Sequence, residues 1–202
     1  MKTKIAVLVS GGGTNLQALL DAQKSGVLCS GEIALVVSNN AGAFALERAK
    51  NAGVPTAVLL KKELGGQAGF EKALGETLKE HGIQVIILAG FMSILSWDFT
   101  KQYPRRILNV HPSLIPAFCG AGFYGLRVHE AALRYGVKVT GATVHFVNEI
   151  PDGGEIIAQK SVDILPGDTP ERLQRRVMEQ AEWILLPRAA EQVCAQIQNS
   201  EE

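Results

Sequence analysis

The stretch that predicts the fold is Ile5-Ala-Val-Leu-Val-Ser-Gly-Gly-Gly-Thr-Asn-Leu16. The continuous apolar run over residues 5–9 is typical of a parallel strand that is buried on both faces. Three glycines then turn the chain, and Leu16, Leu19 and Leu20 follow at helical spacing. A strand, a glycine turn and a helix in this order are the repeating unit of doubly wound α/β sheets.

The same alternation of strands and helices continues up to about residue 111. Further apolar runs predict strands at 33–38, 55–59, 85–89 and 106–110. Helical spacing of apolar residues predicts helices at 42–51, 70–81 and 97–103. We expect the very apolar 85–89 strand at the centre of the sheet and the glycine-rich residues 61–69 in a surface loop. These units predict a mostly parallel, Rossmann-like sheet with right-handed crossovers.

The pattern changes in the C-terminal part of the chain. A helix at 126–135 precedes two strands, 138–147 and 155–164, which we expect to form an antiparallel pair across Pro151-Asp-Gly-Gly154.

A long helical region is expected to close the chain. Thr169 and Pro170 form a helix start, with a capping threonine and proline at the first helical position. The C-terminal helix should run to about Gln198, with a kink or break at Pro187. No linker, repeat or low-complexity run divides the sequence, so residues 1–202 are expected to form a single domain.

Composition limits the classes of partner. Lys+Arg and Asp+Glu both number 20, so the formal net charge is zero and the basic excess of a typical nucleic-acid binder is missing. The apolar run at 5–9 is too short for a signal peptide, and no stretch approaches the roughly 20 apolar residues of a membrane span. We therefore expect a cytoplasmic protein without nucleic-acid or membrane partners.

Cysteines and histidines do not form a metal motif. Cys29, Cys119 and Cys194 are odd in number and widely spaced, which favours neither a disulfide framework nor a zinc site. The four histidines show no HxH or HxxxH spacing, and no catalytic metal is expected.

The glycine turn at residues 10–15 could bind an anion. Glycines let backbone N–H groups approach a phosphate, and the start of a helix favours negative charge. The spacing fits neither the dinucleotide fingerprint nor a Walker loop, so a mononucleotide phosphate is a better match than NAD. The alternative is a tight turn with a Thr14 or Asn15 cap.

Asn109 and His111 form a polar pair at the end of a predicted strand. Two residues apart on an extended segment, they face the same side, and Pro112 stops the strand directly after them. In open α/β sheets, ligands bind outside the carboxyl ends of strands, where this pair could transfer a proton and bind an oxyanion. Otherwise His111 is a buried structural histidine.

Asp152, in the Pro-Asp-Gly-Gly turn, could complete a site with this pair. A carboxylate beside an imidazole orients the ring and raises its pKa. Asp-Gly is also a common hairpin-turn dipeptide, which is the structural alternative for Asp152.

The other histidines have simpler interpretations. His145 lies in a β-branched run and is expected to be a core or edge histidine, and His81 sits at a helix end. His129 could reach the site or lie at the surface. Cys119 could act as a nucleophile with His111, although nothing near it predicts an acidic thiol.

Five segments together resemble the folate-dependent formyltransferase family, and within it the phosphoribosylglycinamide formyltransferases. They are, in family order over residues 4 to about 190, Ser-Gly-Gly-Gly-Thr-Asn-Leu-Gln-Ala18, Leu-Ala-Gly-Phe-Met92, Leu-Asn-Val-His-Pro-Ser-Leu-Ile-Pro116, Val-His-Phe-Val147 and Asp-Gly-Gly154. Methionyl-tRNA formyltransferases and formyltetrahydrofolate deformylases share the Asn-x-His-Pro-Ser core. We expect neither the C-terminal barrel of the former nor the additional N-terminal domain of the latter.

The resemblance implies a role for each matching residue. Asn109, His111 and Asp152 would be the catalytic triad, and Glu182 would contact the glycinamide amine. The substrate phosphate would be held by Gly12, Gly13, Thr14 and Asn15. The folate would be bound by Met92, Ser93, Ile94, Leu95, Asn109, Asn148, Glu149, Ile150, Pro151 and Asp152, with Gln67 nearby. The N-terminal half would thus bind the phosphate and the C-terminal half the folate.

The chain also departs from the family pattern. Gln67 and Ser93 stand where the family frequently has arginines on the folate side, and Trp183 follows Glu182 where the family usually has histidine. Residues 119–128 form a longer loop than the shortest family members have.

The reaction implied is formyl transfer from 10-formyltetrahydrofolate to the amine of glycinamide ribonucleotide through a tetrahedral intermediate. It needs no metal and no covalent enzyme intermediate, and the protein would be a monomer or homodimer. Two alternatives remain open: a formyltetrahydrofolate hydrolase with the same triad, and a catalytically silent sensor of nucleotide or folate.

Overall fold

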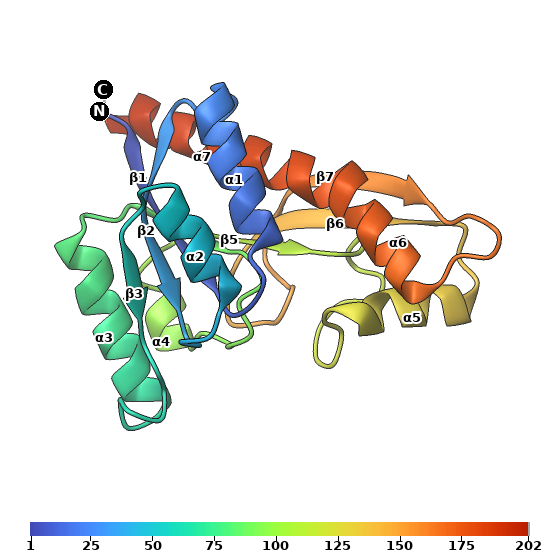
Figure 1. Cartoon of the computed structure of the whole chain (residues 1–202), viewed down its shortest axis with the longest axis horizontal. Coiled ribbons are helices and arrows are strands. Elements are labelled where there is room, and N and C mark those ends of the chain that lie inside the picture. The colour runs from blue at the N-terminus through green and yellow to red at the C-terminus, as the bar shows by residue number, and fades with distance from the viewer. Residues whose placement is uncertain (202) are drawn as a thin grey trace.

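The computed structural model describes residues 1–201, which build one seven-stranded sheet in the order β3-β2-β1-β4-β5-β6-β7 (Figure 1). The strands are β1 (Thr3–Val9), β2 (Gly31–Ser38), β3 (Thr56–Val58), β4 (Val85–Leu88), β5 (Ile107–His111), β6 (Val139–Phe146) and β7 (Ile156–Asp163). β1 to β5 are parallel, β6 is antiparallel to β5, and β7 is antiparallel to β6. The predicted mostly parallel sheet with an antiparallel C-terminal pair is confirmed, and β4 lies at its centre.

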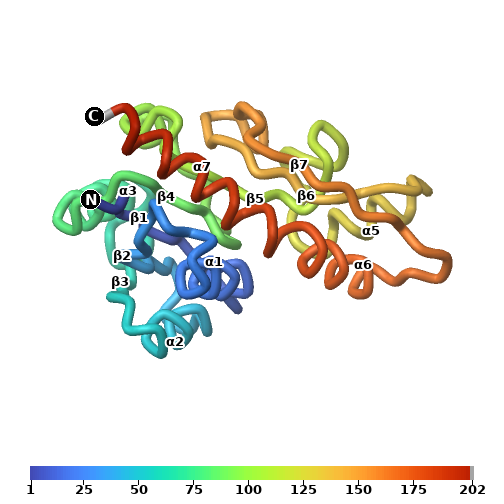
Figure 2. Tube along the Cα trace, turned by 90° about the horizontal axis from the view of Figure 1, so that it is seen from above, coloured from blue at the N-terminus to red at the C-terminus, as the bar shows by residue number. Residues whose placement is uncertain are grey.

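Helices cover both faces of the sheet. They are α1 (Thr14–Ser25), α2 (Phe44–Asn51), α3 (Gln67–Glu80), α4 (Trp97–Thr100), α5 (Leu126–Tyr135), α6 (Pro170–Val177), the π-helical turn η1 (Met178–Glu182) and α7 (Trp183–Glu201). Buried apolar side chains of α1, α2, α6 and α7 pack on one face, and those of α3 and α4 pack on the other. α7 crosses the molecule and brings the C-terminal end beside the N-terminus, where Gln198 donates to the Met1 carbonyl (Figure 2).

β1 illustrates why this sequence forms a two-sided sheet. All five residues from Ile5 to Val9 are fully buried. Ile5, Val7 and Val9 contribute to the core under α1 and α7, whereas Ala6 and Leu8 contribute to the core under α3. A continuous apolar run is required because strand side chains alternate between two covered faces.

Two local predictions were inaccurate. The expected loop at 61–69 is shorter, because α3 already begins at Gln67, directly after Gly65 and Gly66 with positive φ. Pro187 does not break the C-terminal helix, which runs through it. The irregularity lies earlier, in η1, where the Trp183 N–H bonds back to the Met178 carbonyl across a wider turn.

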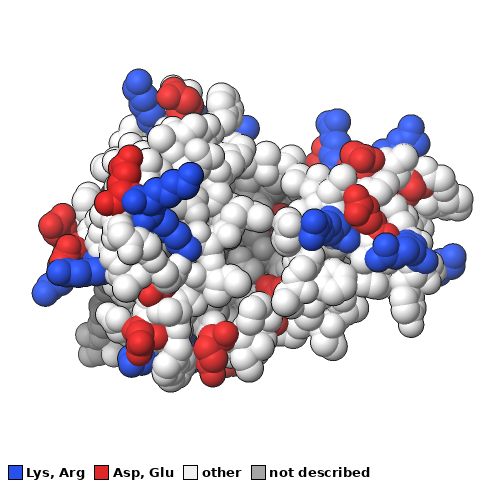
Figure 3. All heavy atoms as spheres, turned by 90° about the horizontal axis from the view of Figure 1, so that it is seen from below, with Lys and Arg blue, Asp and Glu red and all other residues white. Residues whose placement is uncertain are grey.

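The strand order places the reversal point of the sheet between β1 and β4. After β1 the chain continues to β2 on one side, and after β4 it continues to β5 on the other side. A crevice therefore opens between the carboxyl ends of β1 and β4. Figure 3 looks onto the side that lies below in Figure 1 and shows the surface hollowed between two bulkier parts, with charges of both signs scattered around it. Within the described chain, no helix is both long enough and apolar enough to cross a membrane.

The start of α1 depends on glycine at position 13. Gly13 has φ 72°, and a Cβ on it would lie 2.6 Å from the Ala45 Cβ and 2.8 Å from the Ala45 Cα. α2 therefore packs directly against the backbone of the glycine turn.

Gly13→Ala should consequently lower the free energy of unfolding by about 2–4 kcal/mol, the sum of left-handed strain and a backbone clash. Gly26→Ala is the matched control, since Gly26 has φ 82° and open space around its missing Cβ; it should cost only about 1 kcal/mol. Urea unfolding of both variants measures the difference, and equal losses would contradict the close approach of α2.

Candidate active site

β5 directs Asn109 and His111 to one side of the sheet. Ile107, two residues before Asn109, packs on the α3 and α4 face, so alternation places both polar side chains on that face too. His111 is buried and Asn109 is half-buried. The pair thus lies where the sheet extends beyond the cover of α3 and α4.

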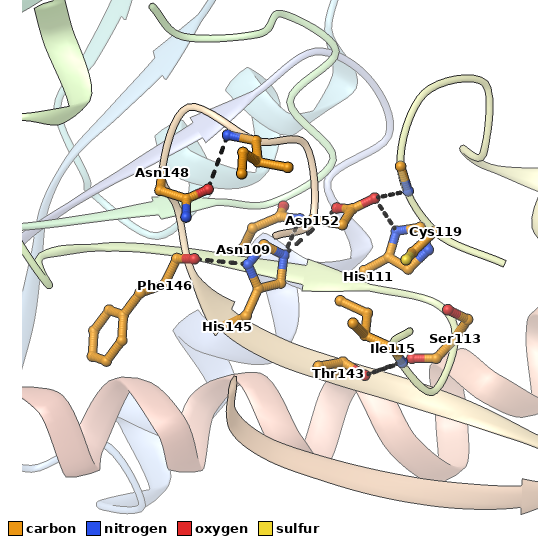
Figure 4. Close-up of polar contacts among 12 residues, drawn as sticks. Asn109, His111, Ser113, Ile115, Cys119, Thr143, His145, Phe146, Asn148 and Asp152 are labelled. Carbon is orange, nitrogen blue, oxygen red and sulfur yellow. Dashed lines mark hydrogen bonds and ion pairs between the residues drawn. The ribbon is translucent and has the colours of Figure 1, made fainter. Parts of the chain in front are cut away.

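Asp152 reaches this pair from the β6–β7 connection (Figure 4). One carboxylate oxygen, Oδ2, lies 3.4 Å from His111 Nδ1 and accepts a hydrogen bond of 2.8 Å from the Gly120 N–H. The connection can fold back because Gly154 has no side chain: a Cβ there would lie 1.7 Å from the Phe146 carbonyl oxygen. The three predicted groups Asn109, His111 and Asp152 are therefore brought together.

His145 also belongs to this cluster, contrary to the expectation of a plain core or edge histidine. β6 pairs with β5 so that His145 lies directly opposite Asn109. Its Nε2 is 3.2 Å from Asn109 Nδ2 and 3.6 Å from Asp152 Oδ1. Apart from its place in the Val-His-Phe-Val147 segment, nothing in the sequence signalled this contact, because it depends on the register of two paired strands.

The backbone fixes the tautomer of His145 and thereby the orientation of Asn109. His145 Nδ1 lies 2.8 Å from the Phe146 carbonyl oxygen, which can only accept, so Nδ1 carries the hydrogen. In the neutral ring Nε2 is then an acceptor and takes one N–H of Asn109 Nδ2. The second N–H of that amide stays available to a bound molecule.

Burial dominates the charge state of His111. Desolvation lowers the pKa of His111, and it outweighs the raising effects of its bond to the Phe118 carbonyl and of the Asp152 charge. Asp152 raises the pKa of His111 as expected, but burial outweighs this influence and the net shift is downward. For Asp152, burial raises the pKa, but the nearby His145 ring, the hydrogen bond from the Gly120 N–H and the His111 imidazole bring it below its usual value.

Cys119 does not have the properties of a nucleophile. Burial, followed by the Asp152 charge, raises the pKa of its thiol, which donates to the Pro116 carbonyl. A thiol with a raised pKa is mostly protonated near neutral pH and reacts poorly.

The glycine turn after β1 is open to solvent and leads into α1. Gly11 and Gly12 are exposed, and the first N–H groups of α1 have no partner within the helix. Arg48 of α2 donates to the Gly12 carbonyl. The Asn15 side chain, by contrast, points inward and donates to Glu182 at 2.7 Å, so it does not line the exposed turn with Gly12, Gly13 and Thr14.

The two segments assigned to folate differ in exposure. Met92 and Ile94 are exposed, Leu95 is buried, and Ser93 accepts a hydrogen bond from Asn39. Gln67 donates to Glu71 and to the Ile94 carbonyl, which joins α3 to this segment.

The second segment forms the turn that carries Asp152. Asn148 accepts from the Ile150 N–H, and Glu149, Ile150 and Pro151 are exposed around Asp152, whose φ is 56°. Among the described residues, no group of three or more His, Cys, Asp and Glu could hold a metal.

A family model described as "Formyl transferase" matches residues 3–189, which is nearly the whole chain. The chain belongs to the formyl transferase family.

Relatives of this formyl transferase carry related names. The chain is 44% identical to a Haemophilus influenzae protein named phosphoribosylglycinamide formyltransferase, over 88% of this chain and 81% of that protein. Over 96% of its own length, the chain is 46% identical to the Gallus gallus trifunctional purine biosynthetic protein adenosine-3. The match spans only 19% of that longer protein.

Solved structures agree with the observed fold. Glycinamide ribonucleotide transformylase 1 from Symbiobacterium toebii superposes with a TM-score of 0.90 at 41% identity, covering 96% of this chain and 89% of the other. A formyltetrahydrofolate deformylase from Pseudomonas syringae has a TM-score of 0.86 at 26% identity, covering 97% of this chain and 62% of the other. The predicted family and fold class are confirmed.

His129 of α5 is an unusual buried group of this formyl transferase. It is fully buried rather than at the surface, and neither ring nitrogen has a hydrogen-bond partner among the described residues. Burial, reinforced by His111, lowers the pKa of His129 to about 4.

The stability of the fold should therefore fall as the pH drops from about 6.5 to about 4. In that window the unfolded chain binds a proton at His129 that the folded chain does not, so acid favours unfolding. The shift from 6.5 to about 4 corresponds to at most about 3 kcal/mol. His129→Leu should flatten this part of the pH dependence in urea unfolding; an unchanged slope would contradict the assignment.

Proposed function

We propose that this formyl transferase moves the formyl group of 10-formyltetrahydrofolate to the amine of 5-phosphoribosylglycinamide. The products are formylglycinamide ribonucleotide and tetrahydrofolate, as part of purine synthesis. The convergence of Asn109, His111 and Asp152 in a chain so similar to proteins of that name carries the proposal. A cytoplasmic location and a monomeric or homodimeric state are part of the same proposal.

The amine attacks the formyl carbon directly, without a covalent enzyme intermediate. A new C–N bond forms and the carbonyl oxygen becomes an oxyanion, to which the free N–H of Asn109 donates. The amine nitrogen becomes positively charged and loses a proton, while N10 of the folate gains one as its bond to the carbon breaks.

His111 is suited to move that proton. It is neutral before the reaction because burial lowers its pKa, so it can accept a proton from the attacking amine. The imidazolium that forms is stabilised by the Asp152 carboxylate, which lies 3.4 Å from Nδ1. Its positive charge stabilises the oxyanion until the proton passes to N10. A water could carry the proton between these groups.

The two substrates are assigned to different parts of one domain, residues 1–202. Backbone N–H groups from Gly12 to Asn15 would hold the phosphate in the N-terminal half, and Glu182 would contact the amine. The folate would lie between residues 92–95 and 148–152, with Gln67 at its edge. The single continuous sheet of the described residues supports treating both halves as one unit.

The test is an assay of the purified protein with 10-formyltetrahydrofolate, with and without glycinamide ribonucleotide. Transfer of the formyl group supports the proposal. Formate release that needs no ribonucleotide would instead identify a hydrolase, the activity suggested by the deformylase similarity.

His111→Ala and Asp152→Asn should each lower kcat by about 10²–10⁴-fold, because proton transfer loses its carrier or the charge that stabilises it. Affinity for the phosphate-bearing substrate should be retained. His81→Ala, a histidine at the end of α3, is the control and should leave kcat unchanged. Near-normal turnover in either site variant would refute the mechanism.

His145→Leu should lower kcat by about 10–100-fold, because the Asn109 amide loses the acceptor that orients it. If His145 acts through Asn109, the double variant with Asn109→Ala will be no slower than Asn109→Ala alone. Fully additive losses would show that His145 contributes independently.

A further inference from the structure

The glycine turn after β1 is held from one side by residues 40–48, which lead into α2 and form its first turns. Three consecutive carbonyl groups of the turn accept hydrogen bonds from this segment. The bonds run from Asn40 Nδ2 to the Ser10 carbonyl at 3.1 Å, from the Ala45 N–H to the Gly11 carbonyl at 3.0 Å, and from Arg48 Nε to the Gly12 carbonyl at 2.8 Å. Two of the three donors are side chains, so their contribution can be removed by substitution.

These bonds determine where the N–H groups of the turn point. The peptide bonds of the turn are trans, and the C=O and N–H of a trans peptide point in opposite directions. Because the three carbonyls face α2, the N–H groups of Gly11, Gly12 and Gly13 face the other way. No described residue accepts a hydrogen bond from any of these three N–H groups. Successive N–H groups that lead into a left-handed residue, here Gly13 with φ 72°, are a backbone arrangement that binds anions.

The guanidinium of Arg48 is itself held in place. Its Nη1 donates to Gln17 Oε1 at 3.0 Å, and Gln17 Nε2 donates in turn to the Asp21 carboxylate at 3.0 Å. The guanidinium carbon also lies 5.1 Å from the centre of the Phe44 ring. Side chains of α1 and α2 thus direct the Arg48 donor at the Gly12 carbonyl before any ligand binds.

We infer that Arg48 is a positioning residue of the phosphate site. It binds the Gly12 carbonyl and thereby keeps the Gly13 N–H directed at the phosphate. Without this bond, the peptide between two residues that lack side chains can rotate and present its carbonyl oxygen to the phosphate. The inference rests on the proposed function for the presence of a phosphate at this turn.

Arg48 acts through the backbone rather than through its charge. Its donor lies on the carbonyl side of the Gly12–Gly13 peptide, whereas the N–H groups point to the opposite side. Glycine loses more conformational freedom on ordering than any other residue, so a free turn of three glycines would be costly to order. A turn that is already in the binding conformation loses less entropy when the ligand arrives.

The experiment measures binding of ribose 5-phosphate to the whole chain by calorimetry, together with steady-state kinetics. Arg48→Met keeps the aliphatic part of the side chain and removes the donor, so affinity for ribose 5-phosphate should fall about 5–30-fold. KM for glycinamide ribonucleotide should rise by a similar factor while kcat stays nearly constant, because the phosphate is held equally in the ground and transition states. Unchanged affinity, or a loss confined to kcat, would overturn the inference.

Arg188→Met is the matched control for charge. Arg188 of α7 lines the same groove as Arg48 but is not among the residues that bond to the turn, so its loss should leave the affinity nearly unchanged. Arg48→Lys keeps the charge but not the directed guanidinium, and should restore little of the affinity. An equal loss in Arg188→Met, or full recovery in Arg48→Lys, would show that charge alone matters and would overturn the inference.

Asn40→Ala tests the same principle at a second carbonyl and without any change of charge. It removes the donor to the Ser10 carbonyl and should also weaken binding of ribose 5-phosphate. This variant serves as the main test if Arg48→Met does not fold. Wild-type affinity in Asn40→Ala would then overturn the inference.

Failure of the inference differs from failure of the proposed function. If the wild-type protein does not bind ribose 5-phosphate, the turn holds no phosphate and the inference is wrong. If binding weakens as expected in Arg48→Met but the wild type transfers no formyl group, the inference holds and the proposed reaction is wrong. If the wild type transfers the formyl group and Arg48→Met has an unchanged KM, the reaction stands and the inference is wrong.

Discussion

The Asp152 carboxylate is the group on which the rest of the site depends. It faces the imidazoles of His111 and His145 on two different strands and accepts the Gly120 N–H from a third segment. A largely buried carboxylate is stable only when charged or polar partners replace its lost water. These partners hold its pKa below the usual range, so near neutral pH the site contains a negative charge around which β5, β6 and the loop after β5 are arranged.

This charge competes with burial at His111, and burial prevails. Moving an imidazolium out of water disfavours it, and the Asp152 charge at 3.4 Å only partly compensates. A histidine that is neutral at rest but close to a carboxylate can accept a proton and then be stabilised in its charged form. This order of events matches the proposed reaction, in which the amine nitrogen loses a proton after it has attacked the formyl carbon.

Local patterns in the sequence predicted the elements of the fold and three of the site residues. The apolar run of β1, the glycine turn and Pro112 after His111 each act within a few residues, so their consequences can be read directly. His145 and the Asn15–Glu182 bond could not be predicted in this way. Both depend on strand register or on the packing of segments up to 167 residues apart. The π-helical turn that ends at Glu182 is likewise invisible in the pattern, which continues as one helix.

The inward position of the Asn15 side chain changes how the glycine turn should be understood. A turn that only bound phosphate would need backbone N–H groups and no particular side chain at the second helical position. Here that position carries a buried amide that bonds to a carboxyl group across the molecule. The start of α1 is thus tied to the end of η1 by this bond. Gly13 fixes the position of this helix start through its close contact with α2.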